Sequence, residues 1–237
     1  MTEQVQELLS CDEFPRRAVE LIATAAAEAV AARGRFTMVL TGGRTVQPLF
    51  RHLAAGSGRE LRWLLRERTD YFWGDDRMVA PEHPDSNFGL ARRLFLDELM
   101  VQPEHLHPVA TGLADPGVAA RTYEEEMRGF FGGELTPEGL PNFDLVLLAL
   151  GPDGHVASLF PAGNALAERQ RWATSVSPPE LAPRVARVTM TLPVLNQARL
   201  VLLMAAGGER SKLALRISAG EPGTGGLPAA RLHPAGR

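Results

Sequence analysis

The sequence predicts an α/β protein with a mostly parallel sheet flanked by helices. Short apolar runs typical of buried strands alternate with helical segments along the chain, an order typical of βαβ units. Polar or glycine-rich clusters follow four of these runs, and ligand sites of such sheets form at the carboxyl ends of the strands. Without an internal repeat or a long linker, the 237 residues are expected to form a single domain over 1–237.

Capping residues, glycines and hydrophobic periodicity assign the elements. Ser10 and Glu13 fit a capping box for a helix that ends near Gly34, and Asp115 before Pro116 starts another that runs to about 131. Three more helices are predicted over residues 47–55, 87–99 (capped by Asp85 or Ser86) and 209–218. Strands are predicted over 36–40, 70–73, 106–109, 143–150, 185–191 and 199–206. Loops are expected over 132–141 and 219–228, and the residues after Leu227 are expected to pack little.

Composition narrows the function classes. The net charge is −3 and the pI about 6.1, which does not indicate nucleic acid or an anionic membrane as a partner. Lys212 is the only lysine, so 24 of the 25 basic residues are arginine. Any anionic substrate is therefore expected to be held by local guanidinium groups.

The sequence shows no pattern typical of a disulfide, a signal peptide or a membrane span. Cys11 is the only cysteine, which excludes a disulfide within the chain and disfavours a cysteine metal site. Residues 1–10 lack the basic start and apolar core of a signal peptide, and no apolar run approaches the ~20 residues of a membrane span. We expect a cytoplasmic protein.

The four clusters that follow strands are expected to meet at one edge of the sheet. They lie at 41–45, 74–77, 151–155 and 207–210. In the first, Gly42 and Gly43 expose backbone N–H groups before a helix, which suits an anion, although a plain tight turn is equally compatible with the pattern. It is neither a Walker loop nor a dinucleotide fingerprint, since neither spacing is present.

His155 is the predicted general base, because it can exchange a proton near neutral pH and lies in a glycine-bracketed loop after a buried strand. Asp153 or Asp75 is expected to assist it, and Arg77 to hold an anionic group of the substrate. Ser158 lacks the nucleophile elbow and is better explained by capping or packing. The other histidines lie in less suggestive contexts, and no ligand spacing predicts a metal.

Taken together, these segments resemble the 6-phosphogluconolactonases, the lactone hydrolases of the pentose phosphate pathway. The shared motifs are Thr41-Gly42-Gly43, Gly74-Asp75-Asp76-Arg77, Pro84-Asp85-Ser86-Asn87-Phe88-Gly89, Gly151-Pro152-Asp153-Gly154-His155-Val156-Ala157-Ser158-Leu159-Phe160-Pro161, 189–196 and 207–210. The resemblance implies a Rossmann-like fold, shared with glucosamine-6-phosphate deaminases and ribose-5-phosphate isomerases.

The resemblance also implies an activity: hydrolysis of 6-phospho-D-glucono-1,5-lactone to 6-phospho-D-gluconate, without a metal or another cofactor. The histidine matching His155 activates water in that family. Gly42, Gly43 and Arg77 match phosphosugar contacts, to which we add Asn87 and Gly154 from the shared motifs. The only partner expected is the small-molecule lactone, and the protein is expected to be a monomer or a weak homodimer.

Two basic residues depart from the family pattern. Arg44 stands where serine is common, and Arg210 where lysine is common, so guanidinium groups are expected at both places. Lys212 lies close enough to Arg210 to replace it as the phosphate ligand after a small shift of register.

Three rival functions remain for comparison. A glucosamine-6-phosphate deaminase would carry Asn-Glu-Pro where this chain has Leu159-Phe160-Pro161. A non-catalytic phosphosugar sensor need not keep His155 and is usually fused to a DNA-binding domain, for which no length is left. A nicotinamide oxidoreductase would need the missing glycine fingerprint.

Overall fold

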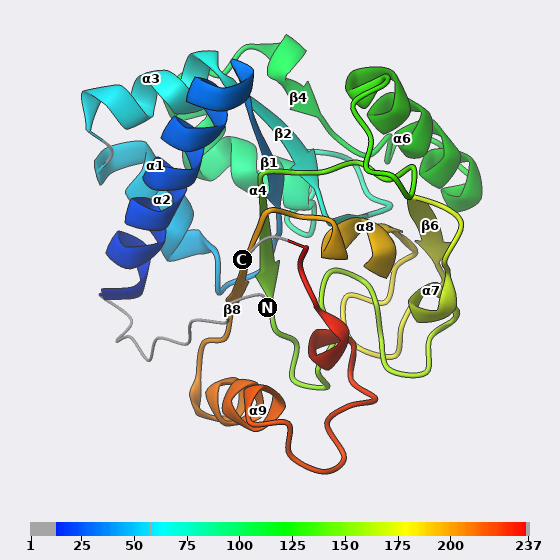
Figure 1. The fold of residues 1–237 in the computed structure, drawn as a ribbon. Helices are drawn as coiled ribbons and strands as arrows, with labels where there is room; N and C mark the ends of the chain where they lie inside the picture. Colours follow the sequence, from blue (N-terminus) through cyan, green and yellow to red (C-terminus); the bar gives the residue numbers. More distant parts are fainter. Residues whose placement is uncertain (1–12, 57, 236–237) are drawn as a thin grey trace.

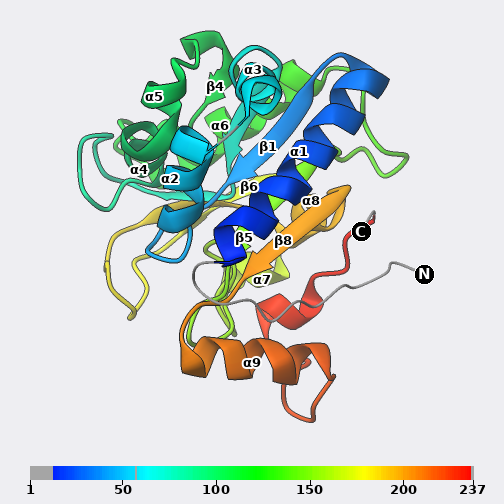
Figure 2. The same cartoon turned by 90° about the vertical axis from the view of Figure 1, so that its left-hand side faces the viewer.

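A five-stranded parallel sheet forms the centre of the fold. The structure, a computed structural model, describes residues 13–56 and 58–235. The strand order is β4-β2-β1-β5-β8, and every adjacent pair is parallel (Figures 1 and 2). The strands are β1 (Phe36–Leu40), β2 (Thr69–Trp73), β4 (Leu106–His107), β5 (Leu145–Ala149) and β8 (Leu200–Met204). The predicted α/β class and mostly parallel sheet are confirmed.

Helices cover both faces of this sheet, as Figure 1 shows. Side chains alternate between the faces of a strand, so Phe36, Met38 and Leu40 of β1 join one core cluster and Val39 joins the other. The first cluster lies under α1 (Glu13–Arg33), α2 (Gln47–Gly56), α3 (Arg59–Glu67), α4 (Asn87–Ala91), the π-helical turn Arg92–Leu96 and α5 (Asp97–Leu99). The second lies under α6 (Pro116–Phe131), α7 (Asn164–Ala167) and α8 (Leu192–Asn196).

A second, antiparallel sheet packs beside the main one. It has the order β3-β7-β6, from β3 (Asp75–Arg77), β7 (Arg187–Met190) and β6 (Ala173–Val176). The strand predicted over 185–191 therefore exists but pairs outside the parallel sheet. The cluster at 74–77 does not join a strand to a helix. After Gly74, residues 75–77 themselves form β3, which follows β2 almost directly.

Most predicted helices are present with small changes at their ends. Asp115 caps α6 by accepting a hydrogen bond from the Val118 backbone at 2.9 Å. Ser86, not Asp85, caps α4 by accepting one from the Gly89 backbone at 3.0 Å. The capping residue Ser10, like Cys11, lies outside the described residues.

Several features differ from the prediction, and the short helices α7 and α8 were not predicted. Helix α3 was missed although Leu61, Leu64 and Leu65 lie at helical spacing and are buried. Strand β6 was missed as well. The chain after Leu227 was expected to pack little, which is wrong: it forms a 3₁₀ turn over Pro228–Arg231, and Leu232 is buried.

Among the helices that the structure describes, none combines the length and the apolar character that a membrane span requires.

A buried histidine pairs with carboxylates at the β4 edge of the sheet. The His107 ring stacks on Phe72 at 4.4 Å, and its Nδ1 lies 2.7 Å from Glu126. Asp70 lies 3.9 Å from His107 Nε2 and 2.9 Å from His105 Nδ1. Burial lowers the pKa of His107, but the hydrogen bond with Glu126 and the charges of Glu126 and Asp70 outweigh it and hold the pKa above its ordinary value.

This cluster predicts a pH-dependent contribution to stability. Because the pKa of His107 is raised in the folded state, its stabilisation is fully present below the unfolded value of about 6.5 and is lost as pH rises through the folded pKa. Urea unfolding of the wild type and His107→Gln, from about pH 6 to about pH 9, should show the largest difference in free energy at the acidic end. A difference that grows with pH would contradict this assignment. His52→Gln serves as the control for loss of a histidine, because His52 lies on α2, outside this cluster.

Candidate active site

The candidate site lies where the strand order reverses. The chain runs outward from β1 to β2 and β4 on one side, and from β5 to β8 on the other, so the switch point is between β1 and β5. Ligands of open parallel sheets bind at the carboxyl ends of the strands at such a point. The loops start side by side: Gly74 N donates to Leu40 O at 2.9 Å, and Leu150 N to Met204 O at 2.8 Å. The predicted meeting of the four clusters at one edge is confirmed.

His155 and Asp153 form a hydrogen-bonded pair in the loop after β5. His155 Nδ1 lies 2.5 Å from Asp153 Oδ1, which also accepts from the His155 backbone at 3.2 Å. Burial raises the pKa of Asp153, but the hydrogen bond and charge of His155 outweigh it and hold that pKa below its usual range. A carboxylate can only accept, so Nδ1 carries the proton and Nε2 presents its lone pair. Among the described residues, Nε2 has no hydrogen-bond partner.

Two glycines shape this loop. A Cβ on Gly151 would lie 2.1 Å from Nδ1 of the His155 ring, so only glycine lets the ring fold back over the loop. Gly154 has a φ of +83°, and its carbonyl accepts a hydrogen bond from Ala229 N at 3.1 Å. The segment around Ala229 therefore contacts the His155 loop from outside. Phe160, with its ring centroid 4.7 Å from that of His155, limits the imidazole on another side.

Asp75 belongs to a different hydrogen-bond network from His155. Its Oδ2 accepts from Ser158 Oγ at 2.6 Å, and its Oδ1 from Asn87 Nδ2 at 3.2 Å. Asn87 Nδ2 also donates to the Asp75 carbonyl at 2.8 Å. Thus, of the two aspartates considered as partners of His155, Asp153 makes the contact and Asp75 fixes Asn87 and Ser158. Ser158 is fully buried and donates to Asp75, so a structural role fits its hydroxyl better than nucleophilic chemistry.

Asn87 links this network to the glycine loop after β1. A Cβ on Gly42 would lie 1.6 Å from Asn87 Oδ1, so the amide packs directly on the Gly42 backbone. Asn87 Oδ1 is shielded from solvent and has no hydrogen-bond partner among the described residues. Gly43 and Arg44 are exposed at the tip of this loop. The loop is therefore held in place at Gly42, whereas Gly43 and Arg44 are exposed to solvent.

Asp76, next to Asp75, holds the start of α4. Its carboxylate accepts backbone hydrogen bonds from Asn87 at 2.7 Å, Phe88 at 2.9 Å and Arg77 at 2.8 Å. Burial raises its pKa to about 6, against the effect of these three donors. Both aspartates are buried, so neither is available for an ion pair on the surface.

Arg77 and Arg187 lie opposite each other on β3 and β7. Arg77 donates from Nη1 to the Asp85 carbonyl at 2.8 Å, and Arg187 from Nη2 to the Pro183 carbonyl at 3.1 Å. The Nε atoms of both arginines are shielded from solvent and unpaired within the described chain. Burial lowers the pKa of Arg187; the charge of Asp75 opposes that effect, and that of Arg77 adds to it. Two neighbouring guanidinium groups with free donors suit an anion.

Sequence reasoning missed Arg187. The signal was present: polar side chains at Arg187, Thr189 and Thr191 occupy alternate positions of an otherwise apolar strand. Such a polar face inside a core is unusual, and here it faces β3 and the loop of Ser158, whose backbone donates to Thr189 Oγ1 at 3.2 Å.

The two basic residues at the start of α9 (Gly208–Ser218) differ in exposure. Arg210 is half-buried and donates to the Ala206 carbonyl at 3.4 Å. The Lys212 side chain is 73% exposed and pairs with Glu209 at 3.3 Å. Strands β5 and β8 are parallel neighbours. His155 follows β5 and Arg210 follows β8, so the two residues lie at the same end of adjacent strands. In the described chain, no group of three or more His, Cys, Asp or Glu side chains is arranged to hold a metal ion.

Comparison with known proteins gives a family match over almost the whole chain. The model of a family described as glucosamine-6-phosphate isomerases/6-phosphogluconolactonase matches residues 10–237. A 6-phosphogluconolactonase of Synechocystis sp. is 38% identical over 236 residues, which cover 100% of this chain and 93% of the relative. One of Mycobacterium tuberculosis is 33% identical over 228 residues, covering 94% and 89%.

Solved structures give the same result. The 6-phosphogluconolactonase from Trypanosoma cruzi superposes with a TM-score of 0.85 at 28% identity, covering 98% of this chain and 90% of that one. The enzyme from Thermotoga maritima has a TM-score of 0.77 at 29% identity, covering 93% and 91%.

Proposed function

Because this chain belongs to the family of glucosamine-6-phosphate isomerases and 6-phosphogluconolactonases, we propose that it hydrolyses 6-phospho-D-glucono-1,5-lactone with His155 as general base. It is a hydrolase of the 6-phosphogluconolactonase type, and the resemblance noted from its motifs is confirmed. The observation that carries the residue assignment is the contact of His155 Nδ1 with Asp153, which leaves Nε2 free at the switch point of the sheet.

The reaction begins with a water molecule held by His155. Nε2 removes a proton from the water as its oxygen attacks C1 of the lactone, and Asp153 stabilises the imidazolium that forms. Backbone N–H groups of the glycine-rich loops stabilise the oxyanion on the carbonyl oxygen. The C1–ring oxygen bond then breaks, and the proton passes from His155 to the leaving ring oxygen. The products are the C5 hydroxyl and a carboxylic acid, which ionises to 6-phosphogluconate.

Guanidinium groups and backbone amides hold the phosphate. Arg77 and Arg187, which lie opposite each other on β3 and β7, supply two neighbouring cations. Asp75 positions Asn87 against the glycine loop and takes no proton itself. The remaining phosphosugar contacts that we propose are Gly42, Gly43, Arg44, Gly154 and Arg210. Lys212 is a poorer choice than Arg210, because it is exposed and paired with Glu209.

The two rival functions that bind phosphosugars fit the site less well. A deaminase would require a carboxylate near Leu159 and Phe160, but Leu159 is fully buried and Phe160 packs on His155. A pure sensor would not need the His155–Asp153 pair. A cytoplasmic location, one domain over residues 1–237, a monomer or weak homodimer, and the absence of nucleic acid, membrane or cofactor partners are further parts of the proposal.

The test is the hydrolysis of freshly generated 6-phosphogluconolactone, coupled to NADP reduction by 6-phosphogluconate dehydrogenase. We expect the rate to rise in proportion to protein concentration above spontaneous hydrolysis. Heat-denatured protein is the control. No acceleration by folded protein that still binds 6-phosphogluconate would instead favour a sensor.

A further inference from the structure

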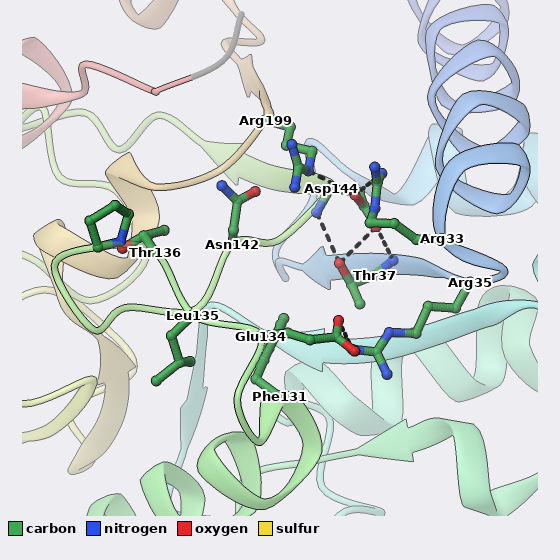
Figure 3. A pocket seen from close by; sticks show the side chains of 11 residues that line it. Arg33, Arg35, Thr37, Phe131, Glu134, Leu135, Thr136, Asn142, Asp144 and Arg199 are labelled. Carbon is green, nitrogen blue, oxygen red and sulfur yellow. Dashed lines mark hydrogen bonds and ion pairs between the residues drawn. The ribbon is translucent and has the colours of Figure 1, made fainter.

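A cavity lies at the amino-terminal ends of the strands, opposite the candidate active site at their carboxyl ends. It has a volume of about 340 Å³ and opens beside the amino-terminal ends of β1, β5 and β8 (Figure 3). We infer that this cavity binds a small organic anion that carries hydroxyl groups: a hydroxy acid or the phosphate ester of a polyol. Its volume is at the lower end of the range of about 300–1,000 Å³ that is usual for small-molecule sites.

The first argument is an excess of positive charge around one buried carboxylate. Asp144 is buried, and its Oδ2 accepts from Thr37 N at 2.8 Å and from Thr37 Oγ1 at 3.0 Å. Its Oδ1 is shared by two guanidinium groups: Arg33 Nη2 at 2.6 Å and Arg199 Nε at 3.3 Å. One arginine would neutralise Asp144, so the second leaves a net positive charge at the cavity wall.

A third arginine adds to this charge. Arg35 lies on the same wall (Figure 3), and its guanidinium stacks over the Phe130 ring at 4.4 Å. Its carboxylate partner, Glu134 at 2.9 Å, is 68% exposed, so solvent screens the pair. The lining therefore holds three cationic side chains and two anionic ones.

The guanidinium groups also retain unused donors. An arginine has five N–H donors. In the described residues, Arg33, Arg35 and Arg199 each reach a carboxylate through a single nitrogen. The remaining N–H groups can bind a carboxylate or phosphate in the planar, two-point manner that such anions favour.

A buried acceptor indicates the hydroxyl group. The Asn142 side chain lines the cavity, and its Oδ1 is covered by neighbouring atoms and has no hydrogen-bond partner in the described chain. An unpaired buried polar atom is costly, and a rotation of the amide toward the cavity would let a hydroxyl donor from a ligand satisfy it. Phe131 and Leu135 form the apolar part of the wall, against which the carbon chain of the ligand can pack.

Amide chemical shifts test the site directly in this 25.7 kDa protein. Glycerol 3-phosphate and D-glycerate are titrated separately, with glycerol as the uncharged control. We expect one or both anions to shift the amides of Thr37, Asn142 and Asp144 saturably, and glycerol to shift none. The better of the two identifies a phosphate ester or a hydroxy acid as the ligand class. Shifts confined to the carboxyl ends of the strands, or no saturable shift at these amides up to about 20 mM, would overturn the inference.

Two substitutions test separately how the negative charge of the ligand and its hydroxyl group contribute to binding. Arg199→Gln should weaken binding of the better probe by about tenfold or more, since it removes charge-assisted hydrogen bonds. Arg92→Gln is the matched control, because Arg92 is 47% exposed against 49% for Arg199 and also pairs with an aspartate. Asn142→Leu should abolish any preference of the cavity for glycerol 3-phosphate over inorganic phosphate. Unchanged affinity in Arg199→Gln would count against the site.

These measurements are independent of the proposed lactonase. The cavity lies at the amino-terminal ends of β1, β5 and β8, whereas His155 and Asp153 follow β5 and Arg77 lies in β3, which follows β2. Binding at the cavity in a protein without lactonase activity would leave the inference intact, and the reverse result would leave the proposed function intact.

Discussion

Replacement of His155 by alanine is expected to lower kcat by about 10²–10⁴-fold, the usual contribution of a positioned general acid–base group. In the proposed mechanism, the imidazole takes a proton from water and returns it to the ring oxygen, so both halves of the reaction lose their catalyst. KM should change little, because the phosphate contacts are made by other residues. The measurement is steady-state hydrolysis, corrected for the spontaneous rate.

The fold should tolerate this change. The His155 side chain is 15% exposed and lies in a loop, where its main packing partner is Phe160. His52→Ala is the control, because His52 lies on α2 and is also partly buried; it should keep its kcat. A His155→Ala protein that keeps its thermal unfolding profile and a kcat within about twofold of wild type would remove His155 from the mechanism.

Asp153→Asn then distinguishes an assisting charge from simple positioning. Asparagine keeps an oxygen that can accept the Nδ1 proton, but it has no negative charge to stabilise the imidazolium. We expect kcat to fall less than in His155→Ala, with KM nearly unchanged. Asp75→Asn tests the other aspartate. Since Asp75 contacts Ser158 and Asn87 rather than His155, its loss should alter KM and stability more than kcat.

The loop around His155 could be predicted from sequence because its information is local. Glycines at 151 and 154 bracket the histidine, and an apolar strand precedes them. Helix α6 was predictable for the same reason, since Asp115 and Pro116 mark its start within a few residues.

Contacts between distant segments could not be predicted in this way. Arg187 faces Arg77 only because β7 pairs antiparallel with β3, which strand propensity does not reveal. The choice between Asp153 and Asp75 depended on side-chain direction. The end of the chain packs because Ala229 N reaches the Gly154 carbonyl, 75 residues earlier, at 3.1 Å.

Arg77→Ala is expected to raise KM for the phosphorylated lactone by about 10–100-fold while changing kcat little. A hydrogen bond to a charged group contributes about 1.5–3 kcal/mol, and every 1.4 kcal/mol is tenfold. Arg77 is a better test than Arg187, which is 3% exposed and whose loss would also affect folding. Arg77→Lys should recover part of the lost affinity, because lysine keeps the charge but not the planar fork.

The unphosphorylated substrate makes this test specific to the phosphate. Glucono-1,5-lactone has the same reacting carbonyl but no phosphate, so Arg77→Ala should leave its KM nearly unchanged. Arg216→Ala is the control for loss of an arginine, since Arg216 is 51% exposed and pairs with Glu221 on the surface. Equal increases in KM for both lactones would mean that Arg77 supports the shape of the site rather than the phosphate. The phosphate would then have to be held by Arg187, or by Arg44, Arg210 or the Gly43 backbone, which are exposed or half-buried at the carboxyl ends of the strands.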